Sequence, residues 1–299
     1  LHTALMTAQL LAFLTYIKTK KNLCLYLLAL LNGLAISNHL WALFELLCFA
    51  IFIAFLTFKR RLTFKDQLIC SLLWLVGFAP YGFLIIEELI ATGDLAAVIS
   101  SALFGKLWQN TVLNASVTPK IVLENLLFLA MNFPTPVFIL FFVGLAALPA
   151  YAPAKAFTMV IFTLLALYFI FAFRYTVADR YVFFIPVYVL ISLLISAGSY
   201  VLFKKHTSVK VFAVVIILAL TPAAVYIFLP QIGRKFYPAL GQRRQRPYRD
   251  EYEYFLQPWR QDNIGAEKFA RQALETVEKN AVIWADSTIV HTLFYTRDI

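Results

Sequence analysis

The feature that most constrains this chain is a series of long apolar segments joined by short polar connections. The Lys and Arg residues of these connections cluster on every second connection. Basic loops tend to stay on the cytoplasmic side of a membrane, so the alternation predicts a single orientation, with the intervening connections and everything after Pro230 outside. The cytoplasmic clusters are Lys18, Lys20 and Lys21; Lys59, Arg60, Arg61 and Lys65; Lys155; and Lys204, Lys205 and Lys210.

The composition supports a membrane protein. The chain is 62% hydrophobic and 14% charged, whereas a soluble domain has about 45–50% apolar and about 25% charged residues. We therefore expect an integral protein whose first partner is the lipid bilayer, in a bacterial inner membrane or in the endoplasmic reticulum membrane of a eukaryote. The net charge of +10 is spread over loops and tail rather than gathered in one patch, which argues against a nucleic-acid partner.

The apolar pattern predicts an all-α transmembrane bundle at residues 1–229. A bilayer core about 30 Å thick needs roughly 20 apolar residues per helix. Pro136 interrupts the fifth span, so residues 121–132 are expected to form an interfacial helix before a span at 134–150. A short surface helix is predicted at 95–104 within the outer connection. The eight predicted spans are 1–17, 22–37, 40–58, 67–87, 121–150, 156–173, 181–203 and 211–229.

Residues 230–299 are predicted to begin an extracytoplasmic soluble domain. Residues 231–262 are expected to be irregular, and 264–278 have helical periodicity. The apolar run 281–285, followed by Asp286, predicts a buried strand and an N-capped helix, as at the start of an α/β domain. Both ends of the sequence resemble internal positions, and we expect the chain to be a piece of a longer protein.

No cofactor is identified in the sequence. Cys24, Cys48 and Cys70 lie within apolar spans, where cysteine behaves as a small hydrophobic residue. We therefore expect neither a disulfide nor a metal site. The sequence also contains no phosphate-loop, zinc or dinucleotide-binding motif.

The outer connection between the sixth and seventh spans carries Arg174, Asp179 and Arg180. Two arginines at this depth could bind a phosphate through paired hydrogen bonds. Asp179 could orient one arginine, bind a metal ion or contact a sugar hydroxyl. The alternative is that these side chains only anchor helix ends at the membrane interface.

Two further polar pairs end predicted spans on the same outer face. Asn38 and His39 follow the second span, and His39 could contact phosphate, carry a proton or simply lie at a helix end. Glu87 and Glu88 end the fourth span and could act as a base or as metal ligands. A solvated helix end explains such carboxylates equally well.

Four segments resemble a large family of membrane proteins related to protein O-mannosyltransferases. The first is a Gly-Leu-x-x-x-Asn-His helix end, and the third has the pattern Tyr-x-Val-x-Asp-x-Tyr-x-Phe-x-x-Pro. They occur in the order of that family and span nearly the whole chain. The segments are 33–39, 125–144, 175–186 and 281–286, the last followed by 293–295. Leu1 and His2 also resemble the start of a span that follows an acidic position in that family.

The resemblance implies a glycosyltransferase of the GT-C type, with a polyprenyl-phosphate sugar as donor and a protein or glycan hydroxyl as acceptor. In such enzymes the general base lies in the first outer loop, so we expect it upstream of Leu1 and expect this piece alone to be inactive. The resemblance places Asn38, His39, Asp179 and Arg180 in the active-site cavity, and Arg174 joins them by charge and position.

A transporter or flippase for a lipid-linked sugar is the main rival, and a scaffold that presents the soluble tail is a third interpretation. A transporter would place ionisable residues in the middle of its spans. The polar residues noted above gather at one membrane face, which favours an enzyme.

Overall fold

The computed structural model describes residues 1–105, 109–112, 114, 116–177, 180–206, 208–238, 248–259, 263–286 and 289–297. Over these residues the chain is helical and contains no strand. It folds into two compact units, Leu1–Val215 and Ile216–Ile299. Each unit is described by itself.

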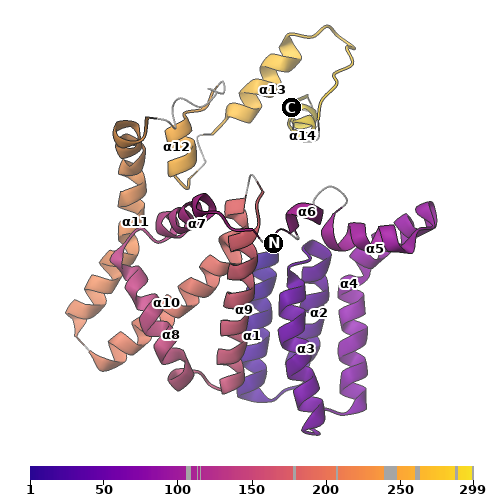
Figure 1. Cartoon of the computed structure of the whole chain (residues 1–299), viewed down its shortest axis with the longest axis vertical. Coiled ribbons are helices and arrows are strands. Elements are labelled where there is room, and N and C mark those ends of the chain that lie inside the picture. Colours follow the sequence, from indigo (N-terminus) through magenta and orange to yellow (C-terminus); the bar gives the residue numbers. More distant parts are fainter. Residues whose placement is uncertain are drawn as a thin grey trace. The chain divides into compact units, whose positions relative to one another are not determined.

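The first unit is a bundle of helices (Figure 1). Short turns join its first four helices. Helix α11 (Val209–Phe236) begins in this unit and ends in the second. The preceding elements are α1 (His2–Thr19), α2 (Leu23–Asn38), α3 (Ala42–Phe58), α4 (Phe64–Thr92), α5 (Leu95–Phe104), α6 (Gln109–Val112), α7 (Pro119–Asn132), η1 (Pro136–Phe138), α8 (Ile139–Tyr151), α9 (Lys155–Arg174), η2 (Arg180–Phe184) and α10 (Ile185–Lys205).

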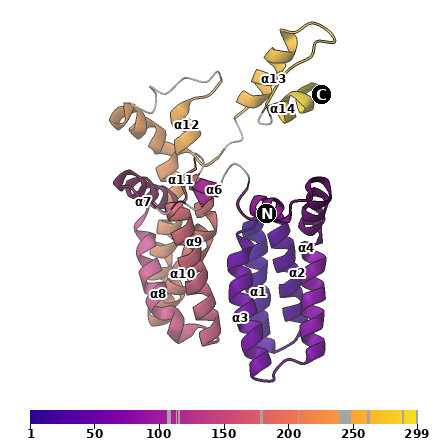
Figure 2. The same ribbon diagram turned by 45° about the vertical axis from the view of Figure 1, so that its right-hand side comes forward.

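The turns of this unit separate basic from other connections, as the charge pattern predicts. Figure 2 shows the turns after α1, α3 and α8 at one end of the helices, and α5 and α7 at the other. The first set carries the lysine and arginine clusters around Lys20, Arg60 and Lys155. His39 and Arg174 end α2 and α9, which run towards the opposite end.

Short polar side chains fix where several helices begin. Thr63 accepts a hydrogen bond from the backbone N–H of Asp66, whose side chain in turn accepts one from the N–H of Thr63, and this capping box begins α4. Asp94 begins α5 through a single cap, in which its side chain accepts a hydrogen bond from the N–H of Ala97. Gly93 ends α4 at a φ of 68°, a left-handed conformation that glycine adopts without strain.

The number of helices that could cross a membrane is smaller than predicted. Four are long and apolar enough, namely Phe64–Thr92, Lys155–Arg174, Arg180–Lys205 and Val209–Phe236. A fifth span exists if the pair Pro119–Asn132 and Pro136–Tyr151, bent by 104°, counts as one. The prediction of eight spans is therefore not supported over the described residues.

The first three predicted spans do form helices, but these helices are too short or too polar to count as membrane spans. α2 and α3 are apolar yet have only 16 and 17 residues, below the roughly 20 that a bilayer core requires. α1 has 18 residues but carries His2, Gln9 and Lys18, which make it less apolar. Exposed apolar side chains on α4, such as Leu72 and Phe83, are those expected of a lipid-facing surface.

The elements around the proline break agree with the sequence. A helix predicted at 121–132 is present as α7, and a bend follows it before η1 and α8. The position of α7 at the membrane interface stays a prediction. The span predicted at 134–150 is shorter than expected, since it consists of η1 and the 13 residues of α8. The surface helix predicted at 95–104 is α5, with the same bounds. Pro136 causes the bend because it cannot continue a helix without losing a backbone hydrogen bond.

The second unit differs from the α/β domain that we expected. Residues 281–286 have no regular structure, and Val282 and Trp284 are almost fully exposed. A strand needs a neighbouring strand to bond its backbone groups, and the described residues supply none. The helix predicted at 264–278 is confirmed as α13 (Gly265–Glu275). The supposedly irregular 231–262 contains the end of α11 and α12 (Glu251–Leu256), and α14 (Val290–Arg297) closes the described unit.

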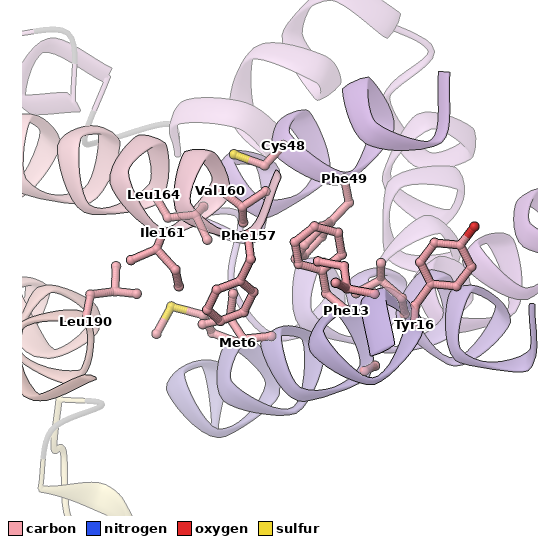
Figure 3. Packing of buried hydrophobic residues seen from close by; sticks show 14 of the residues in the cluster. Met6, Phe13, Tyr16, Cys48, Phe49, Phe157, Val160, Ile161, Leu164 and Leu190 are labelled. Atoms are coloured by element: carbon pink, nitrogen blue, oxygen red, sulfur yellow. The ribbon is translucent and has the colours of Figure 1, made fainter. Parts of the chain in front are cut away.

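The core of the first unit lies between α1, α3, α9 and α10 (Figure 3). Phe13 is fully buried, with its ring centroid 5.5 Å from that of Phe49 and 6.2 Å from that of Phe157. Ile161 and Leu190 extend this packing into α9 and α10. Lipid tails are as apolar as these side chains, so close van der Waals packing, rather than escape from water, holds such helices together.

Two helix pairs meet through glycine. A Cβ atom on Gly33 of α2 would lie 2.2 Å from the carbonyl oxygen of Trp74 on α4, and one on Gly77 would lie 2.4 Å from that of Leu30. Gly144 of α8 and Gly198 of α10 approach each other's helix as closely. These helices are in backbone contact, the geometry that small residues permit in membrane proteins.

Candidate functional site

A network of buried polar side chains crosses the first unit at Glu45, in the first turn of α3. Glu45 is fully buried. One of its carboxyl oxygens, Oε2, accepts a hydrogen bond from Gln9 Nε2 at 2.8 Å, and the other, Oε1, accepts one from Tyr168 Oη at 2.7 Å. A carboxylate gains further stabilisation at the N-terminal end of a helix, where the helix dipole is positive.

The network continues from α1 into α2 and α4. Asn32 Nδ2 donates to Gln9 Oε1 at 3.0 Å and lies 3.2 Å from the carbonyl oxygen of Ala42. Asn32 Oδ1 accepts from Trp74 Nε1 at 3.0 Å. Gln9 and Asn32 are almost completely buried. Unpaired polar groups are costly in an apolar interior, and these pairings avoid that cost by joining five helices: α1, α2, α3, α4 and α9.

His2 forms the other branch of the network, at the start of α1. Its Nε2 lies 3.1 Å from Tyr168 Oη and 3.7 Å from Glu45 Oε1. The residue is 9% exposed. Its second ring nitrogen, Nδ1, is buried and has no hydrogen-bond partner among the described residues. Buried polar atoms are rarely left in this state.

His39 lies beside His2 where the network reaches the surface. The two imidazole centroids are 5.6 Å apart. His39 Nδ1 accepts from the backbone N–H of Trp41 at 3.2 Å, and its ring lies 6.4 Å from that of Phe183 in η2. One side of the residue stays exposed, but the partial removal of its ring from water lowers the pKa of His39. Asn38 is exposed at the last position of α2.

Arg174 fixes the connection before α7 against the end of α9. Its guanidinium donates to the carbonyl oxygens of Val112 at 2.9 Å and Asn114 at 2.6 Å. The side chain of Asn114 donates to Thr176 Oγ1 at 3.2 Å. Arg174 thus has protein partners and orders this segment.

Arg180 is buried and forms an ion pair with Glu124 of α7. Its guanidinium also lies 5.5 Å from the ring centroid of Phe128. Asp179 lies outside the described residues. Asn125 of the same helix is buried and donates to the carbonyl oxygen of Phe173 at 2.7 Å. Helix α7 is thereby attached to both ends of the 174–180 connection.

The residues predicted to share one active site thus have separate sets of partners: those of His39 differ from those of Arg174 and Arg180. The ring of Phe183 connects His39 with the 175–186 segment, since it lies 4.7 Å from that of Tyr175. Among the described residues, no direct contact joins Arg174 or Arg180 to His39. Arg174 reaches it through two rings, since its guanidinium lies 5.1 Å from the ring centroid of Phe171 and that ring contacts Trp41 beside His39. Glu87 and Glu88 are exposed on α4 and take no part in the network. No group of three or more His, Cys, Asp or Glu side chains that could hold a metal ion occurs in the described part of the chain.

Glu45 and Tyr168 were not predicted from the sequence, and His2 was not predicted as a site residue. One signal was available, because Glu45 is the only carboxylate in residues 40–58, a long apolar stretch. An ionisable residue within such a stretch is uncommon and usually faces the protein interior. Gln9 and Asn32 are similarly isolated in their apolar segments. The contact of Glu45 with Tyr168, 123 positions away, had no local signal.

Comparison with known proteins adds no relative: no protein-family model, curated protein or solved structure matches the chain significantly.

Proposed function

We propose that the protein is a membrane glycosyltransferase. It transfers a sugar, mannose or another hexose, from a polyprenyl-phosphate donor to a hydroxyl group of a protein or glycan at the extracytoplasmic face. The observation that carries this proposal is the buried network of Glu45, Tyr168 and His2, which reaches the surface at His39.

The location of this network suits a lipid-linked donor. His39 lies between α2 and α3, where α2 ends after running away from the basic turn that follows α1. With basic turns cytoplasmic, this end faces outward, at the depth of a lipid phosphate. The resemblance of residues 33–39 and 175–186 to protein O-mannosyltransferase relatives points to the same two segments, which meet at His39 and Phe183.

Arg180 would bind the donor phosphate in this proposal. Arg180 has a planar guanidinium suited to two phosphate oxygens, but Glu124 now occupies it. The Glu124 side chain is 39% exposed, so it can move into water when a phosphate replaces it. Arg174 orders the neighbouring segment instead of offering a free charge.

A transfer assay tests the proposal. The full-length protein in detergent is given a polyprenyl-phosphate sugar with a radiolabelled hexose and a mixture of acceptor proteins or glycans. We expect label in the acceptor, and we expect His39→Ala to lower the rate about tenfold to a hundredfold if it removes one charge-assisted contact. His206→Ala is the matched control, since His206 is exposed at the end of α10. A parent protein that labels no acceptor contradicts the proposal.

Transport of a lipid-linked sugar is a second candidate, and one observation favours it. Glu45, Gln9 and Asn32 are buried inside apolar helices, where a transporter places its polar groups. Proteoliposomes with a fluorescent lipid-linked sugar analogue distinguish the two functions. Exchange of the analogue between leaflets without transfer to an acceptor supports transport and opposes the enzyme.

A further inference from the structure

A small cleft in the second unit lies beside α12 and is bordered by the segments before and after that helix. It has a volume of about 130 Å³, and its lining residues fall between positions 248 and 263. All of them belong to the second unit. Aromatic rings, amides and charged groups are mixed in its walls, which is the composition of a site that binds a small polar ligand.

Three aromatic side chains supply the apolar part of the cleft: Tyr248, Tyr254 and Trp259. The ring of Trp259 packs at right angles to that of Tyr226 in α11, with centroids 6.4 Å apart. The hydroxyl of Tyr248 donates to the side chain of Gln272 on α13. Tyr248 also has a φ of 63°, a strained conformation that is found most often at functional sites. Neighbouring helices thus position these rings before a ligand arrives.

The charged side chains around the cleft offset one another. Arg234 Nη2 donates to Asp250 Oδ2 at 3.0 Å and to Glu253 Oε1 at 3.3 Å. The guanidinium of Arg249 lies over the ring of Tyr254, 3.9 Å from its centroid. A cationic ligand would be repelled by Arg249 at this ring, and an anionic ligand would be repelled by the two carboxylates. The cleft therefore favours a neutral ligand.

The polar groups of the cleft fit a ligand that carries hydroxyl groups. The side chains of Asp250 and Glu253 are 42% and 59% exposed, so their oxygens still meet solvent and can accept further hydrogen bonds. The amides of Gln257 and Asn263 can both donate and accept. A hydroxyl group also does both, so it can pair with either kind of group. An apolar ligand would displace water from these groups without replacing its hydrogen bonds.

We infer that this cleft binds a neutral saccharide. A sugar ring presents C–H groups on its faces and hydroxyl groups around its edge. It can therefore lie against the aromatic rings while its hydroxyls pair with the carboxylates and amides. The small volume restricts the occupant to a single sugar unit. The inference goes beyond the proposed function and does not depend on it, because binding requires neither a lipid-linked donor nor transfer.

The test measures binding to the full-length protein in nanodiscs, since many detergents carry sugar head groups that would compete. Methyl glycosides of glucose, galactose and mannose are titrated and followed by saturation-transfer NMR. For ligands of about thirteen non-hydrogen atoms we expect dissociation constants on the order of 1 mM. The ring C–H protons should receive the strongest transfer. Choline and inorganic phosphate are titrated as cationic and anionic probes, and neither should bind.

Two substitutions in the cleft are compared with matched controls. Trp259→Ala removes a ring that lines the cleft and should weaken glycoside binding about tenfold. Its control is Trp284→Ala, because Trp284 belongs to the same unit, is 99% exposed and does not line the cleft. Gln257→Ala tests the polar wall and should also weaken binding, with Gln231→Ala, an exposed position on α11, as its control. Circular dichroism checks that each variant is folded.

The outcomes decide the inference independently of sugar transfer. Saturable glycoside binding that is weakened by the cleft variants, and by neither control, supports it. Absence of binding by every glycoside, or equal binding by the parent and Trp259→Ala, overturns it; if Trp259→Ala does not fold, Gln257→Ala decides. Binding of choline or phosphate in place of the glycosides also overturns it. Because no donor is present, a protein that binds glycosides but transfers no sugar contradicts only the proposed function.

Discussion

Replacing Gly33 by alanine should separate α2 from α4 and destabilise the bundle. The new Cβ atom would lie 2.2 Å from the carbonyl oxygen of Trp74 and 2.9 Å from the backbone nitrogen of Phe78. Both are backbone atoms in a helix and cannot move alone. Reaching an ordinary contact of about 3.2–3.5 Å requires the helices to separate by roughly 1 Å, and such a gap removes a quarter to a half of each contact's dispersion energy.

The expected loss of stability follows from the contacts between α2 and α4 that lie beside Gly33. Overpacking of a tight contact costs about 1–3 kcal/mol. The same separation stretches the bonds from Ser37 to the carbonyl oxygen of Gly77, at 2.9 Å, and from Trp74 to Asn32, at 3.0 Å, each worth about 0.6 kcal/mol in a membrane protein. Alanine recovers about 0.5–1 kcal/mol through its helix propensity. We therefore expect a net loss of about 1–3 kcal/mol.

Gly82→Ala provides a matched control on α4. A Cβ atom there meets only the Phe78 side chain, at 3.2 Å, and that ring can move. Unfolding of both variants is followed by tryptophan fluorescence in mixed detergent micelles at increasing denaturant. Gly33→Ala should unfold earlier than the parent, while Gly82→Ala should match or exceed it. Equal stability of the two variants would refute the backbone contact between α2 and α4.

Three further predictions concern other parts of the chain. Asp66→Asn should lower stability by about 1–3 kcal/mol in the same unfolding assay, because Asp66 accepts hydrogen bonds from Thr63, Tyr26 and Asn22; an unchanged midpoint would contradict this. Arg180→Lys should keep the fold but transfer sugar more slowly, and Arg180→Ala should lose more, about tenfold to a hundredfold; transfer by Arg180→Ala at the parent rate would make Arg180 a structural residue only. The pKa of Asp250 lies below its ordinary value. Partial burial alone would raise this pKa, but hydrogen bonds from the N–H of Glu253 and from Arg234 lower it. Its contribution to stability should therefore be complete above the ordinary pKa of an aspartate, about 3.9, and be lost as pH falls below it. Circular dichroism of the parent and of Asp250→Asn between pH 7 and 2 tests this, and identical acid profiles would oppose it.

The sequence predicted those elements whose signals are local. Helix α5 has the bounds expected from its apolar run, because Asp94 and Gly105 lie at its two ends. The break between α7 and α8 was predictable from Pro136 alone. The helix at 264–278 was found from its periodicity, and the basic turns were found from charge.

The sequence could not predict features that depend on distant partners. Residues 281–285 have the composition of a strand, but no strand pairs with them in the described structure. The number of spans was overestimated because apolar runs were counted without weighing the short lengths of α2 and α3. His2 and Tyr168 meet across 166 positions, and no local pattern in the sequence pairs them.

The most direct test of the central claim is sidedness of sugar transfer. Sealed membrane vesicles of both orientations carry the full-length parent or His39→Ala, and a radiolabelled polyprenyl-phosphate sugar is supplied with an impermeant acceptor outside. We predict transfer by the parent when the extracytoplasmic face is outward, and loss of about tenfold or more in His39→Ala. Transfer only when the cytoplasmic face is outward, or an unchanged rate in His39→Ala, would contradict an extracytoplasmic active site at His39.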